Sequence, residues 1–208
     1  MRLGLNQIDL LVIHDLDRSY HGKSVSNKLQ ELETGMEWLK MMKNSAAIQA
    51  FGAGINDIEM IPLFLEHFEL DFFLVAMPYT LLNQEPLEDI FPECERRGIG
   101  IIIGSPYASG VLASGSKEES KYGYATASEE MRKKVRSIEV ICEDYGIPLK
   151  AAALQFPLAH PQVSSVIPGS LSAAQVLDNI EMLKCPIPPE LWIELKHTGL
   201  LHPEAPVK

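Results

Sequence analysis

A strand-like segment near the end of the chain leads directly into a turn and then into a helix. Residues 163–167 are mostly β-branched, Pro168, Gly169 and Ser170 form the turn, and Ser172 stands where it would cap the helix. Amide donors and the helix dipole converge at such a helix start and attract anions. The segment therefore predicts a site for a phosphorylated ligand, although an ordinary strand-to-helix turn has the same shape.

His14 is the best candidate for a catalytic side chain. It follows the apolar run of residues 8–13 and precedes a polar loop that contains Asp15 and Asp17. Barrel enzymes place their chemistry at the carboxyl ends of parallel strands. A hydrogen-bonded core or loop histidine is the alternative interpretation.

Short apolar segments alternate with longer amphipathic ones along the sequence. The strands are predicted at residues 8–13, 48–52, 72–76, 100–103 and 163–167, and the helices at residues 28–43, 58–67, 87–97, 128–145, 149–159 and 172–182. This alternation predicts an α/β fold with a parallel sheet and helices outside it. The strands have almost no polar alternation, which predicts burial of both their faces.

The number of units constrains the architecture. A closed eight-unit barrel takes about 250 residues, whereas this chain has 208 residues and five βα units. We therefore expect one domain over residues 1–208, either an open sheet or the rear part of a barrel. The polar connection that runs to Ala127 is long for a βα loop and is a candidate lid, with a disordered surface loop as the alternative for residues 114–124.

Composition excludes several classes of function. The formal net charge is −10 and there is no Lys/Arg run, which argues against a nucleic-acid partner. No apolar segment approaches the roughly 20 residues of a membrane span, so we expect no membrane partner. The cysteines Cys94, Cys142 and Cys185 lack metal or redox spacing, which predicts reduced thiols in a cytoplasmic protein and no metal site.

Several segments resemble the aldo-keto reductase family. They are Arg-Leu-Gly-Leu at residues 2–5, the strand ending at His14, Tyr-Thr-Leu-Leu at 79–82, Ser-Gly-Val-Leu-Ala at 109–113, and the strand, turn and helix at 163–179. The resemblance covers almost the whole chain. It implies a TIM-type (β/α)8 barrel truncated to about the last five βα units, with Met1 at an internal position of the family's barrel. Residues 79–82 and 109–113 resemble the branch of D-threo-aldose and L-fucose dehydrogenases.

The resemblance implies a catalytic role for His14. In the family, this histidine donates a hydrogen bond to the substrate oxygen. The family's proton donor is a Tyr assisted by a Lys and an Asp, an arrangement suited to acid–base chemistry on an alkoxide. All three precede the point at which this chain begins, and neither Tyr20, Tyr79 nor Tyr107 matches the position of that Tyr. The chain as given therefore lacks the acid–base group.

The resemblance also implies a set of cofactor contacts. Asn56 corresponds to a nicotinamide-binding Asn, Ser105 and the backbone at Ser109, Gly110 and Leu112 to pyrophosphate contacts, Gly169, Ser170 and Gln175 to ribose contacts, and Asp178 and Asn179 to adenine contacts. Two family positions depart from the pattern, because Ala76 replaces a Gln and Gly104 replaces an aromatic residue. For Asn56, a helix start after a glycine-bearing strand is the alternative.

The turn at residues 168–170 favours NAD over NADP. Relatives that prefer NADP carry a Lys and an Arg where this chain has Gly169 and Gln175. Without a cation, desolvation of a ribose 2′-phosphate is unfavourable, whereas hydroxyl groups need only polar partners such as Ser170.

Three functions follow as hypotheses. The first is NAD-linked oxidation of an aldose, or of a similar alcohol or aldehyde, at C1. The second is a non-catalytic truncated barrel that binds nucleotide weakly or acts in assembly, because exposed barrel edges favour self-association. The third is an unrelated phosphate-binding barrel, a lyase or isomerase, which would bind sugar phosphates without nicotinamide.

Overall fold

The structure, a computed structural model, describes residues 4–123 and 125–208. The chain divides into two compact units, one of residues 1–76 and 89–102 and the other of residues 77–88 and 103–208. The prediction of a single domain over residues 1–208 stays a prediction.

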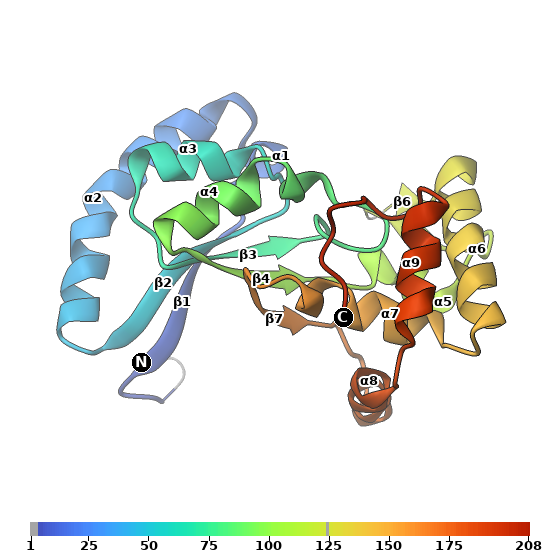
Figure 1. Cartoon of the computed structure of the whole chain (residues 1–208). Coiled ribbons are helices and arrows are strands. Elements are labelled where there is room, and N and C mark those ends of the chain that lie inside the picture. The colour runs from blue at the N-terminus through green and yellow to red at the C-terminus, as the bar shows by residue number, and fades with distance from the viewer. Residues whose placement is uncertain (1–3, 124) are drawn as a thin grey trace. The chain divides into compact units, whose positions relative to one another are not determined.

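The first unit is built from βα repeats. Its strands are β1 (Ile8–His14), β2 (Ile48–Ile55), β3 (Phe72–Ala76) and the beginning of β4 (Gly100–Gly104), and its helices are α1 (Arg18–His21), α2 (Val25–Asn44), α3 (Met60–His67) and α4 (Ile90–Arg97). β1 pairs with β2, and β2 with β3, in parallel. Helices α3 and α4 lie over one face of these strands (Figure 1). The predicted alternation of strands and helices around a parallel sheet is confirmed.

Burial differs sharply between neighbouring strands. In β2, Phe51 and Ile55 are buried, whereas β1 contains no buried residue and Leu10 is 49% exposed. The prediction that both faces of every strand are buried is therefore wrong for β1. The reason is that β1 is the end strand of the sheet and its only described neighbour is β2.

Gly52 shows how the sequence fits this sheet. It lies opposite Phe72 in the β2–β3 register. A Cβ atom at this position would lie 2.2 Å from the Phe72 carbonyl oxygen, so a larger residue would push the strands apart. Gly52, which directly follows Phe51, is thus required because the backbones of β2 and β3 approach closely at this position.

The second unit contains more helix than strand. Its elements are the end of β4, α5 (Val111–Ser114), β5 (Lys121–Tyr122), β6 (Ala125–Thr126), α6 (Glu129–Asp144), α7 (Leu149–Gln155), β7 (Val163–Ile167), α8 (Ala173–Lys184) and α9 (Pro189–His197). The helix predicted at 149–159 ends at Gln155, because Pro157 has no amide to continue it. Residues Pro157–Ala159 form a 3₁₀ turn instead. Ile167 of β7 is exposed, so the prediction of two buried faces is wrong there too.

The long connection predicted as a lid is structured rather than disordered over its described residues. Strands β5 and β6 pair in antiparallel fashion. The Ser116 hydroxyl donates to the Glu139 carboxylate at 2.5 Å, and the Gly123 amide donates to Ser109 Oγ at 3.1 Å. The alternative of a disordered surface loop is wrong for this part of the connection.

Two further observations concern the whole described chain. Within residues 4–123 and 125–208, no helix combines the length and the apolar character needed to cross a membrane.

The three cysteines form no disulfide, and burial raises the pKa of Cys94 to about 11 and that of Cys142 to about 12. These two buried thiols are therefore weak nucleophiles.

Candidate functional site

The carboxyl ends of β1 and β2 bring several predicted polar residues together. His14 is the register partner of Gly54, and both strands run in the same direction. The His14 side chain is 79% exposed, and its Nδ1 atom lies 3.4 Å from the Asp15 carboxylate. His14 is therefore accessible at the edge where parallel strands present catalytic groups.

Asp17 follows His14 by three residues and, in contrast to it, is fully buried. Its carboxylate accepts hydrogen bonds from the Asn56 amide at 2.8 Å, the Asp57 amide at 3.4 Å and Asn56 Nδ2 at 3.4 Å. Burial raises the pKa of Asp17, and these hydrogen bonds oppose the rise. Asp17 thus ties the loop after β1 to the loop after β2. We call His14, Asp15, Asp17, Asn56 and Asp57 the strand-end cluster.

Asn56 is bound within the strand-end cluster. Its Nδ2 atom lies 3.4 Å from Asp15 Oδ1 as well as from Asp17 Oδ2. The side-chain amide donors therefore meet carboxylates of this chain, and the assignment of Asn56 to nicotinamide stays a prediction. Although the cluster is acidic, no group of three or more His, Cys, Asp or Glu among the described residues could hold a metal ion.

The second unit contains a pocket of about 300 Å³. Six of its lining residues were predicted as cofactor contacts: Ser105, Ser109, Gly110, Gly169, Gln175 and Asn179. Four others also line it: Tyr107, Ala113, Lys150 and Leu171. We call these ten residues the nucleotide pocket, after the cofactor contacts that the sequence predicts for six of them. The volume is at the lower end of the range for ligand sites.

Asn179 is the buried polar residue at the centre of a hydrogen-bonded chain in the nucleotide pocket. Its Oδ1 atom accepts from the Tyr107 hydroxyl at 2.7 Å, and its Nδ2 group donates to Ser170 Oγ at 3.1 Å. Burial raises the pKa of Tyr107 to about 12, so this hydroxyl stays protonated as the donor at neutral pH. The chain fixes the orientation of the Asn179 amide.

Helix α8 supplies the remaining predicted contacts. Ser172 caps it by accepting from the Gln175 amide at 3.3 Å, as the sequence predicted. The Gln175 side-chain oxygen accepts from the Leu171 amide at 2.6 Å. This contact does not use the Nε2 group of Gln175. Asp178 does not line the pocket but forms an ion pair with Lys150, which does.

The segment 105–110 has an unusual backbone. Ser105, Ala108, Ser109 and Gly110 all have positive φ values, between 48° and 98°. Non-glycine residues in this region cost of order 1 kcal/mol or more each and cluster at functional sites. Successive amides in such turns form concave anion sites in other proteins.

The amides expected to contact pyrophosphate are already used within this segment. The Ser109 amide donates to Ser105 Oγ, and the Gly110 and Leu112 amides donate to the Tyr107 carbonyl oxygen. Leu112 is fully buried and does not line the pocket. The side-chain hydroxyls of Ser105 and Ser109 line the pocket but are also engaged, because both donate to Met77 Sδ, at 3.9 and 3.2 Å.

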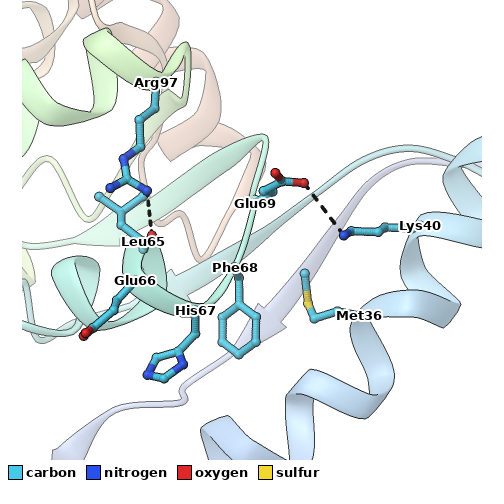
Figure 2. Close-up of a pocket in the computed structure, with 8 residues that line it drawn as sticks. All are labelled: Met36, Lys40, Leu65, Glu66, His67, Phe68, Glu69 and Arg97. Carbon is cyan, nitrogen blue, oxygen red and sulfur yellow. Dashed lines mark hydrogen bonds and ion pairs between the residues drawn. The ribbon is translucent and has the colours of Figure 1, made fainter.

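Another hollow, of about 420 Å³, lies in the first unit (Figure 2). Two of its charged side chains have partners, since Lys40 lies 3.7 Å from the Glu69 carboxylate and Arg97 donates to the Leu65 carbonyl oxygen at 2.6 Å. The connection from α3 to β3 forms part of it, so it lies at the amino end of β3, opposite to the edge that carries His14. It contains no predicted site residue, and we do not regard it as the active site.

Comparison with protein families gives an extensive match. Residues 1–198 match the model of the Aldo/keto reductase family. The chain is 36% identical to pyridoxal 4-dehydrogenase of Microbacterium luteolum over 202 residues and 33% identical to D-threo-aldose 1-dehydrogenase of a Pseudomonas species over 201 residues. Each match covers 96% of this chain and 59% of the relative, so the chain spans about three fifths of their length. The predicted family resemblance is confirmed.

Solved structures give the same fold. An aldo-keto reductase from Bacillus halodurans in its apo form matches with a TM-score of 0.69 and 23% identity, covering 100% of this chain and 66% of that one. Its holo form matches with a TM-score of 0.68 and 19% identity, covering 100% and 62%. The predicted fold class, an α/β chain that corresponds to part of a (β/α)8 barrel, is confirmed.

Sequence reasoning overlooked two features of the nucleotide pocket. Tyr107 was considered only as an acid–base group, whereas its hydroxyl orients Asn179. Lys150 had no role, although Pro148 marks a helix start and thus places Lys150 in the first turn of α7. No signal in the sequence pairs Lys150 with Asp178, because 28 residues separate them.

Proposed function

Because this chain belongs to the aldo/keto reductase family, we propose that it is the nucleotide-binding part of an oxidoreductase that uses NAD to oxidise an aldose, or a similar alcohol or aldehyde, at C1. The observation that carries this proposal is the nucleotide pocket, where residues from 105–113, α7 and the start of α8 converge. NAD when bound supplies the hydride acceptor. The chain's own residues hold the nucleotide and orient the substrate.

The polar groups of the pocket fit an uncharged ribose edge. Gln175 offers amide donors, and the other pocket residues at this edge, Gly169 and Leu171, carry no charge. The cation that lines the pocket, Lys150, is paired with Asp178. A dianionic 2′-phosphate would have to be desolvated without a free positive partner, which favours NAD over NADP.

The substrate assignment depends on His14 and on the relatives. His14 is exposed and can donate a hydrogen bond to a carbonyl or alcohol oxygen. The two relatives described above are dehydrogenases named for pyridoxal and for D-threo-aldoses, so we propose a small polar substrate with an alcohol or aldehyde group. We also propose a cytoplasmic location and no nucleic-acid partner, in keeping with unpaired cysteines and a net charge of −10.

Titration with NADH tests the proposal directly. Energy transfer from Trp192, which is buried in the second unit, reports binding. We expect saturable binding by the 208-residue chain. Gln175→Leu should weaken binding about fivefold, the equivalent of about 1 kcal/mol for a lost hydrogen bond. Gln49→Leu, which removes the same amide from β2, is the matched control and should bind as the unmodified chain does. Absence of saturation would refute the proposal.

Self-association without catalysis is the second candidate function. It is favoured by an apolar stripe on α8, where Val176, Leu177, Ile180 and Leu183 are all exposed at helical spacing. Exposed stripes of this kind drive association. Sedimentation of Leu177→Glu should then show a lower mass than the unmodified chain. Ile193→Glu, at a similarly exposed position on α9, is the control. A monomeric unmodified chain would exclude this candidate.

A further inference from the structure

One charged side chain lines the nucleotide pocket. It is Lys150, in the first turn of α7, and its ammonium group forms an ion pair with the Asp178 carboxylate of α8. The ammonium group also lies 5.6 Å from the centre of the Tyr107 ring, within the range of a cation–π contact. Lys150 therefore has a defined position beside the Tyr107–Asn179 hydrogen bond.

The partner of Lys150 reduces the attraction of the pocket for an anion. Asp178 is an acceptor only and carries one negative charge, so the pair has no net charge. The other nine lining residues are uncharged. A phosphate that approaches Lys150 must compete with a carboxylate already in place. A neutral hydroxyl group needs no cation as its partner and therefore meets no such competition.

We propose that the Lys150–Asp178 ion pair determines which dinucleotide the pocket accepts. Asp178 masks the ammonium group of Lys150 and keeps the pocket selective for a ribose with a free 2′-hydroxyl. Removal of the negative charge leaves a cation that attracts a 2′-phosphate. This inference rests on the proposed function, since it concerns the selectivity of the same site, and it assigns a role to a lysine outside the turn at residues 168–170.

A purely structural role for the pair makes a different prediction. The ion pair links α7 to α8, so its loss could loosen the whole pocket. In that case the affinities for NADH and NADPH would fall together. A charge-based role instead changes the ratio of the two affinities and requires Lys150 to be present.

The test compares four proteins: the unmodified chain, Asp178→Asn, Lys150→Met and the double variant. Titrations with NADH and NADPH are followed by energy transfer from Trp192. Asp178→Asn keeps the size of the side chain and should lower the ratio of the NADPH to the NADH dissociation constant about tenfold at low ionic strength. The change should shrink with added salt. In the double variant the ratio should return to that of Lys150→Met alone.

Glu181→Gln provides the matched control. Glu181 is on the same helix and pairs with Lys184 at 2.9 Å, but neither residue lines the pocket. This change removes the same charge and should leave the ratio unaltered. Saturable NADH binding with an unchanged ratio in Asp178→Asn overturns this inference alone. Failure of the unmodified chain to bind NADH overturns the proposed function, and this inference with it.

Discussion

The strand-end cluster of the first unit and the nucleotide pocket of the second use polar side chains in opposite ways. In the cluster, Asp17 is fully buried and receives three hydrogen bonds from Asn56 and Asp57. In the pocket, Gln175 binds the Leu171 amide through its side-chain oxygen, and this contact does not use its Nε2 donors. Polar residues after a strand can therefore either hold loops together or receive a ligand, and only the partners of each atom distinguish the two roles.

His14 and Asn179 are the exceptions within their regions. His14 belongs to the strand-end cluster but is largely exposed, whereas Asn179 belongs to the pocket but is buried and bound on both sides. Each region thus combines an accessible group with groups whose atoms are bound within the chain. The expected effects of substitutions follow from this distinction.

Loss of Asp17 should have the largest effect on stability. Asp17→Ala leaves the Asn56 and Asp57 amides without their acceptor in a buried place, which should cost about 3 kcal/mol of unfolding free energy. Urea unfolding measures this loss. Asp9→Ala removes an exposed carboxylate that binds Gln49 and should cost less than about 0.5 kcal/mol. Equal effects of the two changes would mean that the cluster is not a structural link.

Loss of the Tyr107 hydroxyl should weaken the binding of NADH in the nucleotide pocket. Tyr107→Phe removes the donor to Asn179 but keeps the ring, so we expect NADH binding to weaken about fivefold and stability to fall by about 1 kcal/mol. Tyr145→Phe removes a hydroxyl that donates to Glu194 at 2.9 Å, elsewhere in the second unit. That control should leave NADH binding unchanged. A similar loss of affinity in both variants would contradict the orienting role of Tyr107.

The pH dependence of stability should distinguish Asp17 from ordinary surface carboxylates. Burial raises its pKa in the folded state above the ordinary value of 3.8. Between these two pKa values the folded state binds more protons than the unfolded state, so the stabilisation that comes from proton binding by Asp17 is present below pH 3.8 and is lost as the pH rises through the folded pKa. The hydrogen bonds that Asp17 accepts from the Asn56 and Asp57 amides do not require this proton. We expect the unfolding free energy of the unmodified chain, relative to that of Asp17→Asn, to fall as the pH is raised from 3.5 to 7. An advantage of Asp17 that grows with pH would contradict the predicted shift.

Much of the fold could be read from the sequence because hydrophobic periodicity is local. The five strands and the Ser172 cap of α8 follow from patterns within a few residues. The exposure of β1 could not be read in this way, because it depends on which strand lies beside it and not on its own residues. The β5–β6 hairpin was missed because each of its strands has only two residues.

The candidate site was predictable where a family motif is contiguous. Gly169, Gln175 and Asn179 belong to one turn and helix, and all three line the pocket. Lys150 pairs with Asp178 across 28 residues, and Asn56 meets Asp17 across 39. Contacts of this range depend on tertiary structure. The sequence accordingly named residues of the site but not their partners.

The smallest effect on stability is expected for His14, and it decides between the two interpretations of this residue. A histidine that serves the fold would be buried or firmly hydrogen-bonded, whereas the His14 side chain is 79% exposed and has Asp15 beside it at 3.4 Å. His14→Ala should therefore change the unfolding free energy by less than about 0.5 kcal/mol, as is usual for exposed positions. A loss of 2 kcal/mol or more, on the order of the buried-contact effects expected for Asp17, would assign His14 to the structural part of the cluster. A negligible change would leave its imidazole free for the substrate, because no interaction of the fold would then depend on it.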